Sequence, residues 1–95
     1  MKNKNQKKSV RINCLISEKL VQLRMPVELH NRLQQAVELS DGKTHHQIVR
    51  YAIRERSRRM GLLEFVELDA KRKNISVSAV IFMSLSAYLD KLEIQ

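Results

Sequence analysis

Several residue types are scarce in this chain of 95 residues, and each scarcity narrows the possible folds. Only 2 glycines and 1 proline are present, which favours a largely helical chain. The single cysteine, Cys14, cannot form a disulfide within the chain, so nothing indicates a secreted protein and we expect a cytoplasmic one. The longest apolar run, residues 79–83, is far too short to span a bilayer, and no targeting signal is visible. We therefore expect no membrane segment.

Signatures of catalysis are missing as well. The chain has no glycine-rich phosphate loop and no evident pair of carboxylates, and Cys14 has no obvious base beside it. The three histidines do not have metal-site spacing, because the adjacent His45 and His46 diverge on a helix and no cysteine or carboxylate completes a ligand set. We therefore expect no enzyme, no metal and no other cofactor.

Positive charge is concentrated in the first part of the chain. The net charge is +8, and residues 1–60 hold 14 Lys/Arg and 5 Asp/Glu (+9), whereas residues 61–95 hold 4 and 5 (−1). A basic first part suits a polyanion, either nucleic acid or an acidic lipid surface, and a nearly neutral apolar second part suits protein contacts. The alternative is that these lysines and arginines only solvate helix faces.

One short stretch has the alternation of a strand. In "LVQLRMP", Val21, Leu23 and Met25 fall on one face, and the opposite face carries Leu20, Gln22 and Arg24. Residues 1–18 are lysine-rich at the start, and "SVRINCLIS" has no clear turn that links it to this strand, so we expect residues 1–18 to form a basic flexible arm. Since a strand is not stable alone, this one needs a partner.

Two helices should follow the strand. Pro26 suits a first helical turn, and "SDG" ends the helix that starts there. Thr44 suits the N-cap of a second helix, which can run to Met60 with Gly61 as its stop.

A strand, a helix, a tight turn and a helix in this order resemble the ribbon-helix-helix DNA-binding proteins of the MetJ/Arc type. The resemblance spans residues 19–60 and is carried by "VQLRMP", by the turn "DGKT" and by apolar residues at fixed offsets after Thr44. It implies that two chains form a homodimer by pairing their strands into an antiparallel ribbon. Val21, Leu23 and Met25 would then be the ribbon core on the helices, and Leu20, Gln22 and Arg24 would contact bases in the major groove.

The chemistry of these residue types agrees with such roles. Arginine donates two parallel hydrogen bonds to guanine, and glutamine both donates to and accepts from adenine. Leu20 departs from the pattern, since an apolar side chain can only touch a thymine methyl. The start of the second helix should bind phosphate through Lys43, Thr44 and His45, because free N–H groups at a helix N-terminus attract anions.

Residues 61–95 should form a helical hairpin. Thr44 precedes Val49 and Ile53 by 5 and 9 positions, and Ser76 precedes Ile81 and Leu85 by the same spacings. A degenerate repeat and a plain helical hairpin both fit this pattern. The last helix is apolar nearly all round, so we expect another subunit to cover it, either by enlarging the dimer contact or by joining dimers into a higher oligomer. The residues expected at that contact are Val77, Ile81, Leu85, Tyr88 and Leu89.

Together these observations predict a mostly α-helical fold with one short β-strand, a ribbon-helix-helix dimer with a C-terminal helical hairpin. The expected function is that of a sequence-specific double-stranded DNA-binding protein, most simply a transcriptional repressor. An accessory role at a plasmid relaxosome or partition site fits the same residues. An antitoxin-like protein-binding module is an alternative of another class.

Overall fold

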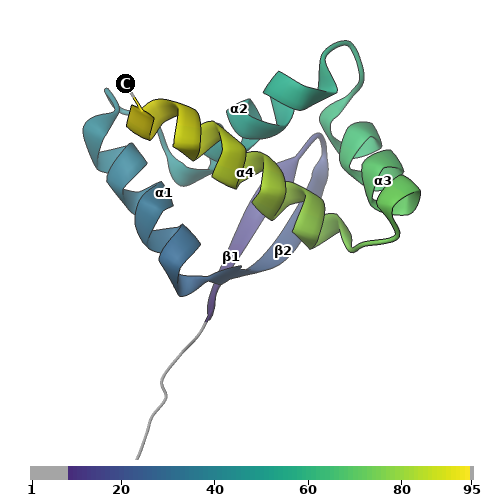
Figure 1. Ribbon diagram of the computed structural model, residues 1–95, viewed down its shortest axis with the longest axis horizontal. Helices are drawn as coiled ribbons and strands as arrows, with labels where there is room; N and C mark the ends of the chain where they lie inside the picture. Colours follow the sequence, from purple (N-terminus) through teal and green to yellow (C-terminus); the bar gives the residue numbers. More distant parts are fainter. Residues whose placement is uncertain (1–8, 95) are drawn as a thin grey trace, which may run out of the picture.

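The computed structural model describes residues 9–94, which form a two-stranded antiparallel sheet and four helices (Figure 1). The elements are β1 (Ser9–Ile16), β2 (Lys19–Pro26), α1 (Val27–Leu39), α2 (His45–Ser57), α3 (Leu62–Lys73) and α4 (Val77–Ile94). The first eight residues of the expected basic arm lie outside the described part. The mostly helical content agrees with the sequence-based prediction, whereas the chain has two β-strands and not the one that we predicted.

The strand at residues 19–26 pairs with β1 of the same chain. Ser17 and Glu18 form the two-residue turn between them, and Ser17 has a positive φ of 57°. The expectation that residues 1–18 form an irregular arm is therefore wrong for β1. Its apolar residues alternate just as those of β2 do, but the turn contains none of the Gly-Asn combinations that usually mark a tight hairpin.

Alternation places one face of the hairpin against the helices. Cys14 and Ile16 of β1 are fully buried, and so are Leu23 and Met25 of β2. Val21, the third residue expected in the ribbon core, is partly buried and packs against the same cluster. The inward face of β2 is therefore the apolar one that its sequence indicated.

The helix pair that follows β2 begins as expected and ends earlier. Pro26 is the N-cap of α1, whose C-cap is Ser40 in the "SDG" turn. The second helix stops at Ser57, three residues before the predicted end at Met60, because Arg58 adopts a positive φ of 56°. Gly61 starts α3 as its N-cap and does not end α2.

Burial repeats between α2 and α4 with a constant offset. The buried positions of α2 are 48, 49, 52, 53 and 57, and those of α4 are 80, 81, 84, 85 and 89, so that each pair differs by 32. The caps repeat with the same offset: the Thr44 hydroxyl accepts from the Gln47 N–H (3.2 Å), and the Ser76 hydroxyl accepts from the Ala79 N–H (3.0 Å).

The preceding helices repeat as well. Leu29 and Leu33 of α1 correspond to Leu62 and Val66 of α3, each pair differing by 33 positions, and all four are buried. Any amphipathic helix buries positions at such spacings, so the matching burial fits both the degenerate repeat and the plain helical hairpin.

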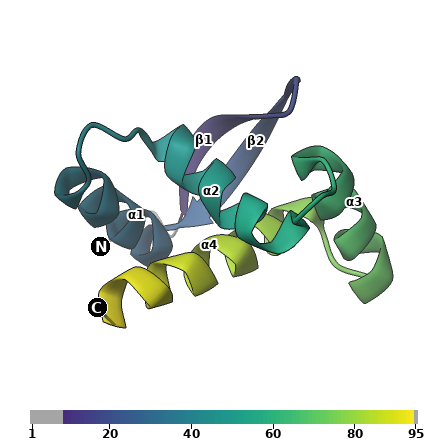
Figure 2. The same cartoon turned by 90° about the horizontal axis from the view of Figure 1, so that it is seen from above.

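The end of β1 lies beside the start of α3, just as the end of β2 leads directly into α1. The Ser17 hydroxyl, in the turn after β1, accepts a hydrogen bond from the Leu63 N–H in the first turn of α3 (3.3 Å). Figure 2 shows the resulting arrangement of the elements, in which the hairpin lies on one side of the molecule and α1 and α3 lie at opposite ends. The strands of the hairpin thus pack on α1, α2 and α4, and its turn contacts the start of α3.

One hydrophobic core joins all these elements. It includes residues of both strands and of all four helices, so the expected division at residue 60 does not separate two cores. The buried carboxylate of Asp69 in α3 ties this helix to α2 through Arg56 (3.7 Å) and to its own last turn through Lys73 (3.0 Å). No single helix within residues 9–94 is long and apolar enough to cross a membrane; α3 and α4 reach that length and hydropathy only together, across a bend of 107°.

Candidate nucleic-acid interface

The face of the hairpin that points away from the core carries a set of exposed side chains, which we call the outer ribbon face. The register places them as three directly opposed pairs: Arg11 with Arg24, Asn13 with Gln22, and Leu15 with Leu20. All six side chains are exposed. Residues expected to contact bases, Leu20, Gln22 and Arg24, thus lie together on one surface.

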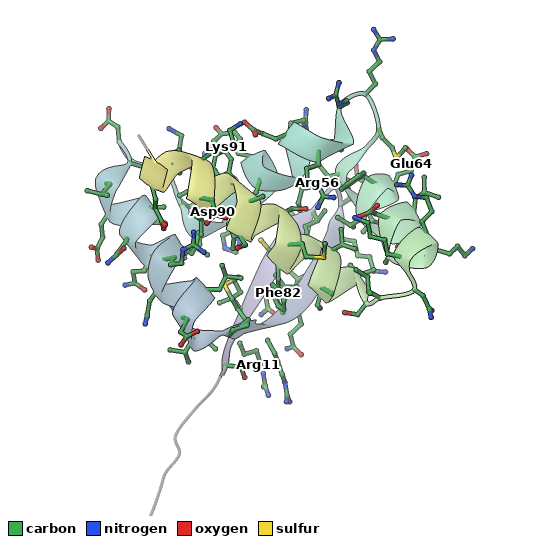
Figure 3. The ribbon with its side chains drawn as sticks, in the orientation of Figure 1. Arg11, Arg56, Glu64, Phe82, Asp90 and Lys91 are labelled. Carbon is green, nitrogen blue, oxygen red and sulfur yellow. The ribbon has the colours of Figure 1, made fainter. Side chains whose placement is uncertain are left out.

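Sequence reasoning missed the other half of this face. Arg11, Asn13 and Leu15 come from β1, which was assigned to the flexible arm. Alternation within "SVRINCLI" was the signal that could have found them, since its apolar residues recur at every second position. Figure 3 shows Arg11 at the edge of the molecule, near the start of β1.

The two arginines of the outer ribbon face are free to bind a ligand. Among residues 9–94, neither Arg11 nor Arg24 forms a salt bridge, whereas Arg32, Arg56 and Arg72 all do. Two guanidinium groups directly opposite each other repel, which costs stability unless an anion or a strong acceptor lies between or above them. Their pairing therefore suits an acceptor-rich partner.

The N-terminus of α2 borders this face. A hollow of about 530 Å³ is lined by Asn13 and Leu20 of the hairpin together with His45 and His46 of α2. Thr44 caps the helix in a capping box, in which its own N–H donates to Gln47 Oε1 (2.9 Å). The next N–H groups, those of His45 and His46, have no acceptor within the helix and can receive an anion.

Lys43 and Thr44 are exposed at this helix start, but the His45 side chain is directed elsewhere. Its ring stacks on that of His30, with the centroids 5.8 Å apart and the planes within 10°. His45 Nε2 is buried and has no hydrogen-bond partner among the described residues. Burial, with the nearby His30 and His46, lowers the pKa of His45. Of the predicted phosphate contacts, His45 can therefore offer its backbone N–H but not Nε2.

An arginine of α2 holds the hairpin in place. Arg50 Nη1 donates to the carbonyl oxygen of Leu15 in β1 (3.2 Å), so this arginine is engaged within the chain. Arg56, also in α2, lies 5.5 Å over the Phe65 ring and donates to Ser84 Oγ (3.1 Å). Arg54, Arg58 and Arg59 remain exposed.

The residues predicted to mediate oligomerisation are covered by the chain itself. Ile81, Leu85 and Leu89 are buried in the core, and Val77 and Tyr88 are partly buried against it. The cover that we expected from another subunit therefore comes from the same chain, because α4 packs on α2 and α3. In this fold these three buried side chains are not available to a second subunit.

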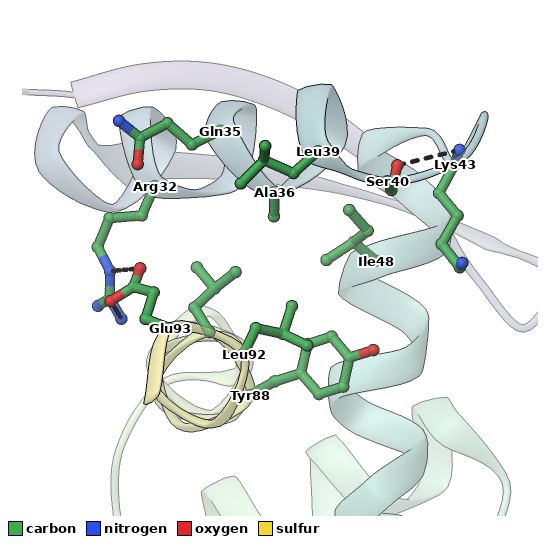
Figure 4. A pocket seen from close by; sticks show the side chains of 11 residues that line it. Arg32, Gln35, Ala36, Leu39, Ser40, Lys43, Ile48, Tyr88, Leu92 and Glu93 are labelled. Carbon is green, nitrogen blue, oxygen red and sulfur yellow. Dashed lines mark hydrogen bonds and ion pairs between the residues drawn. The ribbon is translucent and has the colours of Figure 1, made fainter. Parts of the chain in front are cut away.

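A separate hollow lies between α1 and the end of α4 (Figure 4). It measures about 360 Å³ and is lined largely by apolar side chains, with Leu39 88% exposed beside it. At one end Arg32 binds Asp90 (2.6 Å) and Glu93 (2.9 Å), and the exposed Lys43 lines the hollow as well. It offers no convergent polar groups for a small ligand.

Within residues 9–94, no three His, Cys, Asp or Glu side chains are placed to share a metal ion. Burial raises the pKa of the Cys14 thiol, which suits a core residue and not a nucleophile. Comparison with models of protein families, with curated proteins and with solved structures found no match to this chain.

Proposed function

We propose that this protein binds double-stranded DNA in a sequence-specific manner, as a ribbon-helix-helix unit built from one chain. The observation that carries the proposal is the outer ribbon face, where two arginines and two amide side chains are exposed on a two-stranded ribbon. A ribbon of this width fits the major groove, and these are the residue types that form paired hydrogen bonds with guanine and adenine.

The backbone contacts would come from the start of α2. The free N–H groups after Thr44 border the hollow that Asn13 and Leu20 line, so a phosphate bound there would fix the position of the ribbon in the groove. The exposed Lys43, one residue before this cap, would add a positive charge at the same helix start. The net charge of +8 adds a general attraction to DNA that does not depend on sequence.

The two-stranded ribbon that we propose as the DNA-reading surface needs no second chain. In the families that the sequence resembles, the partner strand comes from another subunit, whereas here β1 occupies the edge of β2 along its whole length. We therefore propose that one chain is the DNA-reading unit, and that any association of chains takes place through other surfaces.

A comparison of base reading with charge attraction tests this function. A duplex library with a randomised centre first yields the preferred site, and the wild type, Arg24→Ala and Lys43→Ala are then titrated with that site and a scrambled duplex at several salt concentrations. Arg24→Ala should cost about 1–3 kcal/mol on the preferred site and much less on the scrambled one. Lys43→Ala should weaken both about equally and reduce the salt slope by roughly one.

A matched control is Lys71→Ala, which removes an exposed lysine from α3. This variant should keep the preference for the selected site, and it should weaken binding much less than Lys43→Ala does. Equal weakening of both duplexes by Arg24→Ala would show that the outer ribbon face is only an electrostatic surface.

We propose repression of transcription as the role of this binding, since a protein bound over a promoter excludes the polymerase. Genome-wide footprinting tests the setting. Occupied sites at promoters would support it, and sites confined to a plasmid transfer origin or a partition locus would contradict it.

A further inference from the structure

The three opposed pairs of the outer ribbon face differ in chemistry and follow a fixed order. Arg11 and Arg24 form the first pair, at the end of the hairpin where β1 begins. The central pair consists of the two amides, and the pair nearest the turn consists of Leu15 and Leu20. Along the ribbon the face therefore changes from two cations, through two amides, to two apolar side chains.

A ribbon of two identical strands cannot have this order. Two-fold symmetry would repeat the chemistry of one end at the other, because each strand would run through the same residues in the opposite direction. Here the strands differ, and each contributes an arginine to one end and a leucine to the other. The two ends of this face thus favour different ligand groups.

Resting on the proposed function, we infer that the protein reads a non-palindromic DNA site in one orientation, with guanines under the arginine end, adenines under the amide pair and thymines under the leucine end. Arginine pairs with guanine O6 and N7, asparagine and glutamine pair with adenine N6 and N7, and an apolar side chain contacts the thymine methyl. From Arg11 to Leu15 a strand advances about 13 Å, which corresponds to roughly four base-pair steps.

Contact with water alone gives no reason for two opposed leucines on this exposed face. Leu15 is 47% exposed and Leu20 is 64% exposed, although they are opposed on a surface whose other members are all polar. The backbone beneath them is fixed, since Arg50 donates to the Leu15 carbonyl oxygen. A thymine methyl would cover apolar surface that water now contacts.

The probe for this contact is deoxyuridine, which lacks only the thymine methyl. After selection from a library of randomised duplexes, each thymine of the preferred site is replaced in turn and the dissociation constant is measured for the wild type and for Leu15→Ala/Leu20→Ala. Replacement at the leucine end should weaken wild-type binding about threefold to fivefold per methyl, as expected for one buried methyl group. The double variant should bind thymine and deoxyuridine duplexes equally.

Arg11→Ala/Arg24→Ala provides the opposite arm. It should lose the guanine preference at the far end of the site and keep the sensitivity to the thymine methyl. Leu39→Ala, which also removes an exposed leucine but from α1, is the control and should behave as the wild type. All substituted side chains are exposed, so circular dichroism and unfolding midpoints should match the wild type.

Four results would overturn the inference. A palindromic preferred site, or equal sensitivity to deoxyuridine in the wild type and the leucine variant, would remove the polarity and leave the proposed function standing. Enrichment of no sequence at all would overturn both. Altered oligomer size in Leu15→Ala/Leu20→Ala with unchanged DNA preference would assign the leucine pair to contacts between chains.

Discussion

At the scale of single residues, the two faces of β2 have different tasks. Leu23 is fully buried between the hairpin and the helices, whereas Leu20, three positions earlier, is exposed. Leu23→Ala should lower the free energy of unfolding by about 2–5 kcal/mol, because it removes buried methyl groups and leaves a cavity. Leu20→Ala is the matched control and should change it by less than about 0.5 kcal/mol. Urea denaturation measures both, and equal losses would contradict the assignment of the faces.

His45 makes stability depend on pH. The pKa of His45 is lowered in the folded chain, whereas in the unfolded chain the same side chain should titrate at about pH 6.5. As the pH falls below that value, the unfolded state binds a proton that the folded state does not bind. The free energy of unfolding therefore decreases as the pH approaches the lowered pKa of the folded state. His45→Phe keeps a ring on His30 but cannot titrate.

Chemical denaturation between pH 4.5 and pH 8.5 checks this. The wild type should lose stability relative to His45→Phe only in the acid part of this range, and the difference between the two should be constant above about pH 7.5. A difference that is constant over the whole range would show that His45 does not contribute to acid sensitivity.

The outward residues of β2 were predicted from alternation, and those of β1 were missed although the same alternation is present. Both strands alternate, but Ser17-Glu18 carries no residue that strongly favours a two-residue turn, and lysines precede the first strand. The direction of the His45 ring was also beyond sequence reasoning, since it depends on His30 from another helix.

At the scale of elements, a hydrogen bond links the turn after β1 to the start of α3. It depends on Ser17, whose hydroxyl accepts from the Leu63 N–H. Ser17→Ala should cost about 1 kcal/mol, as for loss of an N-terminal cap. Ser17→Asn should cost less, because asparagine tolerates a positive φ and can supply an acceptor.

Thermal unfolding of both variants, followed by circular dichroism, measures the ranking. An alanine variant as stable as the wild type would mean that this hydrogen bond does not hold the hairpin to α3. An asparagine variant less stable than the alanine variant would contradict the capping role.

Three of the helix ends followed from the sequence, whereas the end of α2 did not. Caps at Pro26, Ser40 and Thr44 have recognisable residue types. By contrast, the end of α2 at Ser57 is set by the turn into α3, where Arg58 takes a conformation that its residue type does not indicate. The matching burial of α2 and α4 was visible in the equal spacings after Thr44 and Ser76. The strand β1 lies at the other end of the chain, so these spacings gave no indication of it.

At the scale of the whole molecule, the account predicts that the ribbon is closed within one chain. Asn13 and Gln22 are directly opposed on the exposed face, so cysteines at both positions should form a disulfide. The double variant Asn13→Cys/Gln22→Cys, with Cys14→Ala to remove the native thiol, should oxidise to a species of monomer mass on a non-reducing denaturing gel.

The single variant Gln22→Cys in the same background is the control. It should remain a monomer under mild oxidation, because no second β2 lies opposite it. Efficient cross-linking of two chains through Gln22→Cys alone would indicate strand pairing between chains, as in a homodimeric ribbon.

The central claim is that the outer ribbon face and the start of α2 meet DNA. The most direct measurement is a titration of the ¹⁵N-labelled protein with its selected duplex, followed by amide chemical shifts. The largest changes are expected in β1, β2 and the first turn of α2, and small changes along α3 and in the second half of α4. Large changes along α3 or in the second half of α4, with the hairpin amides unmoved, would contradict this claim.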